Sequence, residues 1–314
     1  MATPSSEGDA LNRPGGAWPG RFAPWCFAAP GLLLLFLFLV LPFLLACLFS
    51  FTDQRLLASD ALPTGFVALR NYARLLRDGN VWAAFRNNLY FAAVVTPVQS
   101  TLALGLALLV NRDLPGTRFF RTIYFMPVAT TMAVVTVIWS LFYVPDPGLV
   151  NRLVHLLSLG AIGPHDWLRD PHLVLPAVMA LSIWQGAGFQ MLVFLAGLQA
   201  IPKDLYEAAA MDGAGEWQQF RSITLPMLRN TTIFVLVTTT IYALQVFTQV
   251  QIIAAGGASA PVNAFRTVVM LVVQEGFRSG RIGYASALSV VFFLAVLGVS
   301  SLQRALARDR EPGP

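Results

Sequence analysis

The chain has 314 residues, of which 56% are hydrophobic and only 12% are charged. This composition excludes an ordinary soluble domain and is typical of a protein that spans a membrane. The formal net charge is +5, but the 21 basic residues are spread over all the polar connections. Because nucleic-acid binding needs basic residues gathered on one face, we expect no nucleic-acid partner.

Six stretches of the chain carry no charged side chain and are long enough to cross a bilayer, which takes about 20 apolar residues. The predicted spans are about 25–52, 89–110, 122–143, 173–198, 231–253 and 284–302. The predicted fold class is therefore an all-α polytopic membrane protein whose helices contact the lipid bilayer. Because six is an even number, both termini are expected on the same side of the membrane.

The six spans belong to one predicted transmembrane domain, 22–303. Residues 1–21 are rich in Gly, Pro and Ser and show no hydrophobic periodicity, so they are predicted to form a disordered tail. Residues 304–314 are predicted to form a second, short tail.

The connection between the first two spans contains one candidate helix. Apolar residues and three arginines alternate at helical spacing over 69–77, which predicts an amphipathic helix. Both a helix lying on the membrane surface and a helix in a solvated loop fit this pattern.

The residue types that bind metals or form disulfides are sparse. All 3 histidines lie in the loop 144–172, where no cysteine accompanies them and their spacing matches no common zinc pattern. Cys26 and Cys47 both fall in the first span, about 32 Å apart along a straight helix, which is too far for a disulfide. We therefore expect no metal site and no cofactor.

The fifth span carries a polar stripe. Plotted at 100° per residue, Thr231 falls in line with Thr238, Tyr242, Gln245 and Gln249. Such a stripe is costly against lipid, so it should face protein or water. Two interpretations stay open: the stripe binds the hydroxyls and apolar faces of a sugar, or it only ties helices together at about 1 kcal/mol per contact. On the first, the substrate-pathway residues are Gln185 of the fourth span, Thr238, Tyr242, Gln245 and Gln249.

The connection 199–229 between the fourth and fifth spans is polar and long. Connections of this kind usually have roughly six residues or fewer, so its length needs a reason. Lys203 to Met211 is predicted to form a short helix, Asp212-Gly213 a turn that tolerates positive φ, and Glu216 to Ser222 the start of a second helix. The product is a helix-turn-helix whose first helix carries three consecutive alanines, suited to close docking against a partner.

This helix-turn-helix carries an extended motif. Glu207-Ala208-Ala209 is followed after three residues by Gly213, and after nine more by Ile223-x-Leu225-Pro226. The motif resembles the cytoplasmic coupling motif of ATP-binding-cassette (ABC) importer permeases. Asp212, Ala214 and Phe220 make it similar to the carbohydrate-uptake branch, typified by the maltose permeases.

The resemblance implies a cytoplasmic coupling helix-turn-helix that docks on an ATPase. Glu207 would make a polar contact with the ATPase, Ala208 and Ala209 would pack closely, and Asp212 and Gly213 would form the turn. The implied partners are a second homologous permease subunit, two ATP-binding-cassette ATPase subunits, an extracytoplasmic solute-binding protein and a sugar substrate. The implied location is the bacterial inner membrane, with both termini cytoplasmic.

The chain lacks an energy source of its own. Its only lysine, Lys203, follows Pro202, so no P-loop can exist, and no ionisable side chain lies deep in a predicted span. Paired carboxylates or nucleophile–base sets are also missing at the membrane faces, so no residue is expected to be catalytic. Two alternatives stay open: an ABC permease for a glycerol phosphate or another small solute, and an ion-coupled secondary transporter whose sodium site is built from backbone carbonyls.

Overall fold

The computed structural model describes residues 23–56, 65–112, 116–146, 148–257 and 260–308. Within these ranges every regular element is a helix, and the only pairing of extended backbone is an isolated antiparallel bridge between Thr52 and Phe66. The all-α class is therefore confirmed. The predicted tail at 1–21 lies outside the described residues.

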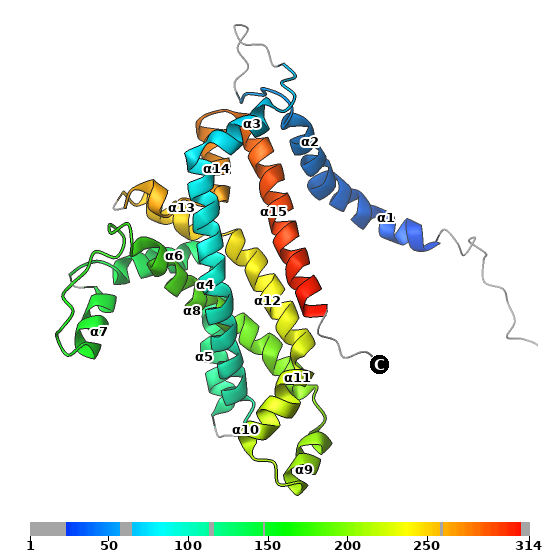
Figure 1. The fold of residues 1–314 in the computed structure, drawn as a ribbon, viewed down its shortest axis with the longest axis vertical. Helices are drawn as coiled ribbons and strands as arrows, with labels where there is room; N and C mark the ends of the chain where they lie inside the picture. The colour runs from blue at the N-terminus through cyan, green and yellow to red at the C-terminus, as the bar shows by residue number, and fades with distance from the viewer. Residues whose placement is uncertain (1–22, 57–64, 113–115, 147, 258–259, 309–314) are drawn as a thin grey trace, which may run out of the picture.

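The helices follow one another along the chain as shown in Figure 1. The N-terminal half contains α1 (Ala23–Leu35), the π-helix η1 (Phe36–Val40), α2 (Leu41–Phe49), α3 (Arg70–Arg77), α4 (Gly79–Val110), α5 (Thr117–Ala129), α6 (Met132–Phe142) and α7 (Leu149–Leu157). The C-terminal half contains α8 (Val174–Gln199), α9 (Lys203–Met211), α10 (Glu216–Gln219), the π-helix η2 (Phe220–Thr224), α11 (Leu225–Met227), α12 (Arg229–Leu244), α13 (Thr248–Ala255), the 3-10 helix η3 (Val262–Ala264), α14 (Val268–Val273), the π-helix η4 (Gln274–Arg278) and α15 (Ile282–Arg308).

Among the described residues, 5 segments are long and apolar enough to cross a membrane. They are Pro24–Phe49, Gly79–Val110, Val174–Gln199, Arg229–Ala255 and Ile282–Ala307. A sixth span results if Phe119–Ala129 and Met132–Phe142, which bend by 100° at a short break, are counted together. The six predicted spans therefore correspond to five helical segments and one bent pair.

The centre of the bundle is the packing of α4 against α8. Ala84, Ala103 and Ala107 of α4 are fully buried, and small side chains let helices approach closely. On the other side of α8, a Cβ atom added to Gly188 would lie 2.0 Å from the Tyr124 carbonyl oxygen of α5. Glycine is therefore required where α5 crosses α8.

The first span leans away from this bundle. In Figure 1, α1 points outward and only α2 approaches α15. The turn after α2 is fixed at the start of α15, because the Gly283 N–H donates to the Gln54 carbonyl at 2.9 Å and a Cβ on Gly283 would lie 2.0 Å from Thr52 O. The apolar side chains of α1 are exposed in the isolated chain.

The predicted span 122–143 is not one continuous helix. The chain turns by 100° between α5 and α6, and Thr130 and Thr131 have extended backbone with ψ of 139° and 141°. Pro127 lies in the last turn of α5, where its ring removes one helical N–H. The Thr130 carbonyl left by the break accepts a hydrogen bond from Gln185 Nε2 at 3.2 Å, which stabilises the bend.

The predicted fifth span is also interrupted. α12 ends at Leu244 and α13 begins at Thr248, so the helix assumed over 231–253 breaks at residues 245–247. Asn88 of α4 holds the break: its side-chain amide donates to the Leu244 carbonyl, and its Oδ1 accepts from the Val268 N–H at 2.8 Å. Because Asn88 is 1% exposed, these hydrogen bonds satisfy backbone groups that water does not reach.

Two helices extend beyond the bounds of the predicted spans, and one predicted helix is confirmed. The second span was expected at 89–110, but α4 begins at Gly79, where the Asp78 side chain accepts from the Asn80 N–H at 2.9 Å as an N-cap. The last helix was expected at 284–302 but continues to Arg308, so the predicted tail is helical up to that residue. The amphipathic helix expected over 69–77 is present as α3.

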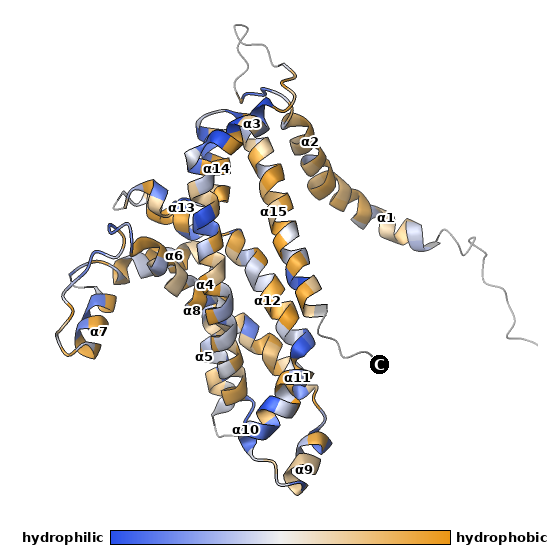
Figure 2. Ribbon diagram, viewed as in Figure 1, coloured by the Kyte–Doolittle hydropathy of each residue, from blue (hydrophilic) through white to orange (hydrophobic). Residues whose placement is uncertain are grey.

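The polar ends of the molecule lie far apart. Figure 2 shows hydrophilic residues gathered at α3 and at α10–α11, with the apolar helices between them. The helix-turn-helix of α9 and α10 projects from one end of the bundle, and α3 and the start of α15 lie at the other (Figure 1).

Candidate functional site

The turn of the helix-turn-helix has the backbone conformation predicted from Asp212-Gly213. Gly213 has φ +83°. Two hydrogen bonds close the end of α9: the Gly213 N–H donates to the Ala210 carbonyl at 3.0 Å, and the Ala214 N–H donates to the Ala209 carbonyl at 2.9 Å. This is the Schellman arrangement, in which the left-handed position is nearly always glycine. The local sequence therefore fixes how α10 follows α9.

The outer surface of this helix-turn-helix combines small, polar and large apolar side chains. Glu207 and Ala208 are exposed and Ala209 is half-buried. Sequence reasoning missed Met211 and Trp217, whose side chains are 90% and 72% exposed. The sequence did contain a signal for these two residues, because they are large apolar residues in an otherwise polar connection. Exposed aromatic and Met side chains are enriched at protein interfaces.

The helix-turn-helix is anchored to the bundle at its base. The Tyr206 hydroxyl of α9 lies 2.9 Å from Thr224 Oγ1 of η2. Tyr206 and Ile223 also pack on an apolar cluster that includes Leu198 and Leu228. The base is thus continuous with the cores of α8 and α12.

A second candidate site is a cavity of about 310 Å³ next to the breaks in α5–α6 and α12–α13. It is lined by residues of α4, α6, α8, α12 and α13 and of the break between the last two. Its polar lining comprises five glutamines, two threonines, a serine and a tyrosine: Gln99, Gln185, Gln190, Gln245, Gln249, Thr239, Thr248, Ser182 and Tyr242. Phe91, Phe189 and Phe247 contribute aromatic surface.

No charged residue lines this cavity. The groups presented are neutral donors and acceptors beside aromatic rings, which is the chemistry that matches an uncharged, hydroxyl-rich solute. Among the described residues, no three His, Cys, Asp or Glu side chains gather in a way that could hold a metal ion.

Some of the cavity's polar groups already have partners within the chain. Gln249 Nε2 donates to Ser182 Oγ at 3.2 Å, and the Gln190 amide donates to the Thr239 hydroxyl. These contacts tie α13 and α12 to α8. Gln249 therefore performs the structural role that was one of the two interpretations of the polar stripe.

Four other polar side chains of the lining have no hydrogen-bond partner among the described residues. They are Gln99, Tyr242, Gln245 and Thr248. Gln99 fits beside α8 because Gly186 has no side chain. A Cβ on Gly186 would lie 2.3 Å from Gln99 Nε2. These side chains are not engaged by hydrogen bonds within the described chain, and the sequence analysis did not include Gln99 because it lies on α4, outside the stripe.

The structure brings four of the five predicted pathway residues to one cavity. Gln185, Tyr242, Gln245 and Gln249 line it. Thr238 does not: its hydroxyl donates to the Phe234 carbonyl at 2.7 Å within α12. The stripe placed Thr238 on the cavity side, but the neighbouring Thr239 of α12 lines the cavity instead.

Comparison with known proteins agrees with this architecture. The family model described as binding-protein-dependent transport system inner membrane component matches residues 99–311. A solved bacterial ABC transporter involved in the import of the acidic polysaccharide alginate contains a chain with a TM-score of 0.77 and 21% identity, covering 91% of this chain and 95% of that chain. That likeness concerns the fold.

Two similar proteins are named for different solutes. The lactose transport system permease protein LacF of Rhizobium radiobacter is 32% identical over 292 residues, covering 91% of this chain and 94% of that protein. The sn-glycerol-3-phosphate transport system permease protein UgpA of Yersinia pestis is 34% identical over 242 residues, covering 77% of this chain and 80% of that protein. The resemblance read from the 207–226 motif is thus confirmed: the chain belongs to the inner-membrane permeases of binding-protein-dependent ABC importers, the family that imports carbohydrates and related solutes.

Proposed function

We propose that this permease translocates a neutral sugar or related polyol through the cavity between α4, α8 and α12, and that the 203–222 helix-turn-helix couples this movement to ATP hydrolysis by partner subunits. The single observation that carries the substrate class is the uncharged lining, in which Gln99, Tyr242 and Gln245 keep free hydrogen-bonding groups beside aromatic rings. A charged solute would enter such a site without a counterion, which is costly away from water.

The proposed coupling role rests on the surface and the anchoring of the helix-turn-helix. Four exposed side chains could contact a partner. Glu207 offers a polar contact, Ala208 a small one, and Met211 and Trp217 two large apolar ones. We assign Ala209 to close packing and Asp212 and Gly213 to the turn that presents these side chains. Because Tyr206 joins this unit to Thr224, an ATPase that moves α9 would move the base of α12 with it.

The proposed assembly contains a second homologous permease subunit, two ATP-binding-cassette ATPase subunits and an extracytoplasmic solute-binding protein. Under this proposal the helix-turn-helix and both termini face the cytoplasm, so that α3 and the start of α15 face the binding protein. The solved transporter with a TM-score of 0.77 that contains an alginate-bound periplasmic protein supports such a partner by its fold.

The test is solute-stimulated ATPase activity of the assembled transporter in proteoliposomes. Lactose, trehalose, maltose, glycerol and sn-glycerol 3-phosphate would each be supplied with the cognate binding protein. We expect stimulation by a neutral sugar or polyol. Stimulation by glycerol phosphate alone would contradict the neutral substrate class and favour the activity that the name of UgpA describes.

The role of the cavity is tested by Gln245→Leu against Gln251→Leu. Gln251 lies on α13 but outside the cavity lining, so it is a matched control for the loss of one amide. Removing one neutral hydrogen bond weakens binding about three- to tenfold, so Gln245→Leu should raise the KM for uptake by that factor. An equal KM for the two variants would show that the substrate does not bind at Gln245.

A further inference from the structure

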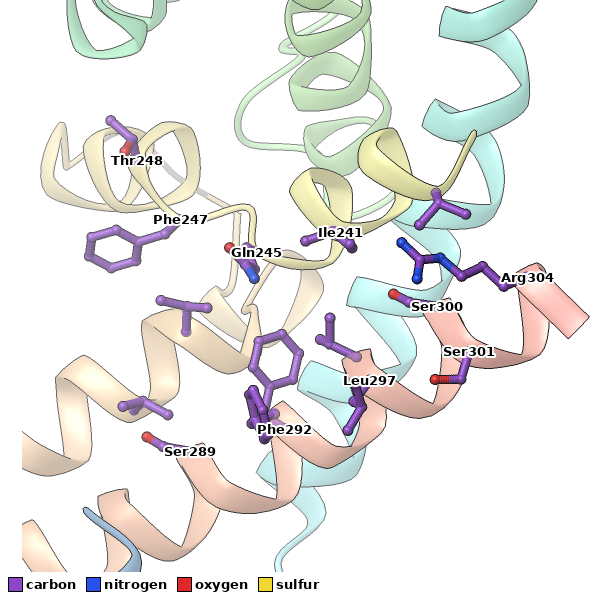
Figure 3. Close-up of a pocket in the computed structure, with 15 residues that line it drawn as sticks. Ile241, Gln245, Phe247, Thr248, Ser289, Phe292, Leu297, Ser300, Ser301 and Arg304 are labelled. Atoms are coloured by element: carbon purple, nitrogen blue, oxygen red, sulfur yellow. The ribbon is translucent and has the colours of Figure 1, made fainter. Parts of the chain in front are cut away.

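A second cavity, of about 800 Å³, lies between α12, α14 and α15 and shares only Gln245, Phe247 and Thr248 with the lining of the cavity of the proposed translocation route (Figure 3). Its lining is mostly apolar. Ile241 of α12 and Phe292, Val296 and Leu297 of α15 form its length. An apolar cavity of this size on the side of a membrane protein is suited to a hydrocarbon chain.

One end of this cavity is polar and basic. Arg304, Ser300 and Ser301 lie at that end, and Phe247 and Thr248 lie at the other (Figure 3). Arg304 forms no ion pair with any described residue, and no Asp or Glu lines the cavity. Ser300 Oγ is buried without a hydrogen-bond partner in the described part of the chain. An unpaired guanidinium beside two hydroxyls is a site for a phosphate group.

The basic end lies where the headgroups of a bilayer would be. The charge-free run 282–303 ends directly before Arg304, so Arg304 marks the end of the hydrophobic span. The Arg229 side chain donates to the Ala307 carbonyl, which places this end of α15 beside the base of the helix-turn-helix. From Ser289 to Arg304 the lining extends about 22 Å along α15, which exceeds the ~15 Å of hydrocarbon in one leaflet.

We propose that this cavity binds an anionic phospholipid, with its phosphate on Arg304, Ser300 and Ser301 and one acyl chain along Ile241, Phe292 and Leu297. Basic pockets between spanning helices recognise such headgroups because the phosphate charge is neutralised while the chain stays in an apolar environment. The inference is independent of which solute is transported.

The test uses the complete transporter, purified with its partner chains and analysed by native mass spectrometry during titration with phosphatidylglycerol. Arg304→Gln removes the charge and should weaken retention of one lipid about fivefold. Leu297→Trp keeps the charge but fills the groove, and because Leu297 is 51% exposed the larger ring does not disturb the core. This variant should also lose the lipid.

Arg152→Gln is the matched control, because Arg152 is an exposed arginine of α7 far from this cavity in the chain. It should retain the lipid as the native protein does. Equal retention by the native protein and Arg304→Gln would overturn the proposal, as would an equal loss with Arg152→Gln. Displacement of the lipid by millimolar inorganic phosphate, or equal retention of phosphatidylcholine, would also overturn it.

A second measurement identifies the occupant in native membranes. A photo-crosslinking amino acid introduced at Leu297 should yield an adduct with the mass of a phospholipid. An adduct with another protein chain, or with a second copy of this chain, would show that a helix fills the groove and would refute the lipid site.

Discussion

The hydroxyl of Tyr206 lies 2.9 Å from the hydroxyl of Thr224, and this contact joins α9 to the π-helix that leads into α11 and α12. The two residues are 18 positions apart and enclose the whole turn of the helix-turn-helix. The contact therefore closes the helix-turn-helix into a rigid unit at its base.

Tyr206→Phe is expected to weaken coupling without preventing assembly. The variant keeps the ring in the apolar cluster and loses only one hydrogen bond, worth about 0.5–1.5 kcal/mol. Uptake per ATP hydrolysed should fall, measured in proteoliposomes against Tyr90→Phe. Tyr90 is 50% exposed and its hydroxyl makes no hydrogen bond among the described residues. Unchanged uptake per ATP in Tyr206→Phe would argue against a rigid base.

Gly213→Val is expected to abolish uptake while the protein still reaches the membrane. Gly213 has φ +83°, and a β-branched residue in the left-handed region costs on the order of 1–3 kcal/mol. Gly215→Val is the matched control: Gly215 has φ −72°, and nothing lies within 4 Å of an added Cβ. Membrane level by immunoblot and uptake by filtration distinguish the two. Normal uptake with Gly213→Val would remove the basis for the assigned turn.

Gly186→Ala and Gly188→Ala should fail in different ways. The new Cβ at 186 meets the flexible end of Gln99, so that amide is displaced into the cavity and the protein stays folded. The new Cβ at 188 meets the backbone of α5 at 2.0 Å, which a side-chain rotation cannot relieve. We expect a raised KM for uptake in the first variant and a lowered yield of folded protein in the second. Gly105→Ala, with open space around its Cβ, is the control for both.

Asn88→Leu should destabilise the fold because the leucine side chain forms no hydrogen bonds. The variant leaves the Leu244 carbonyl and the Val268 N–H buried without partners, at roughly 1–3 kcal/mol for each group. Thermal unfolding of the purified chain in detergent should shift to lower temperature, whereas Asn230→Leu at an exposed position of α12 should change little. Similar melting of both variants would mean that the break in α12–α13 does not depend on Asn88.

The sequence predicted elements whose causes are local. α9 was predicted with both of its bounds, because Pro202 and the Asp212-Gly213 turn act on the helix they adjoin. Membership of the importer family followed from the spacing of 207–226. Both depend on residues that are neighbours along the chain.

The breaks in the helices were not predictable in the same way. Gln185 accounts for the turn at Thr130 and Asn88 for the turn at Leu244, and each acts from a different helix. The stripe covered the fifth span alone, so Gln99 of α4 was omitted, and it included Thr238, whose neighbour Thr239 lines the cavity instead. Contacts between residues distant in the chain decide such features, and a single sequence does not reveal them.

Gln245 and Thr248 line both cavities, so the interrupted segment between α12 and α13 is a shared wall. Under the two proposals, a lipid in the cavity between α12, α14 and α15 would contact the same segment that lines the polar cavity. The solute preference of this permease would then depend on the surrounding phospholipids as well as on the protein. Variants ranked in detergent micelles would be ranked differently in a bilayer.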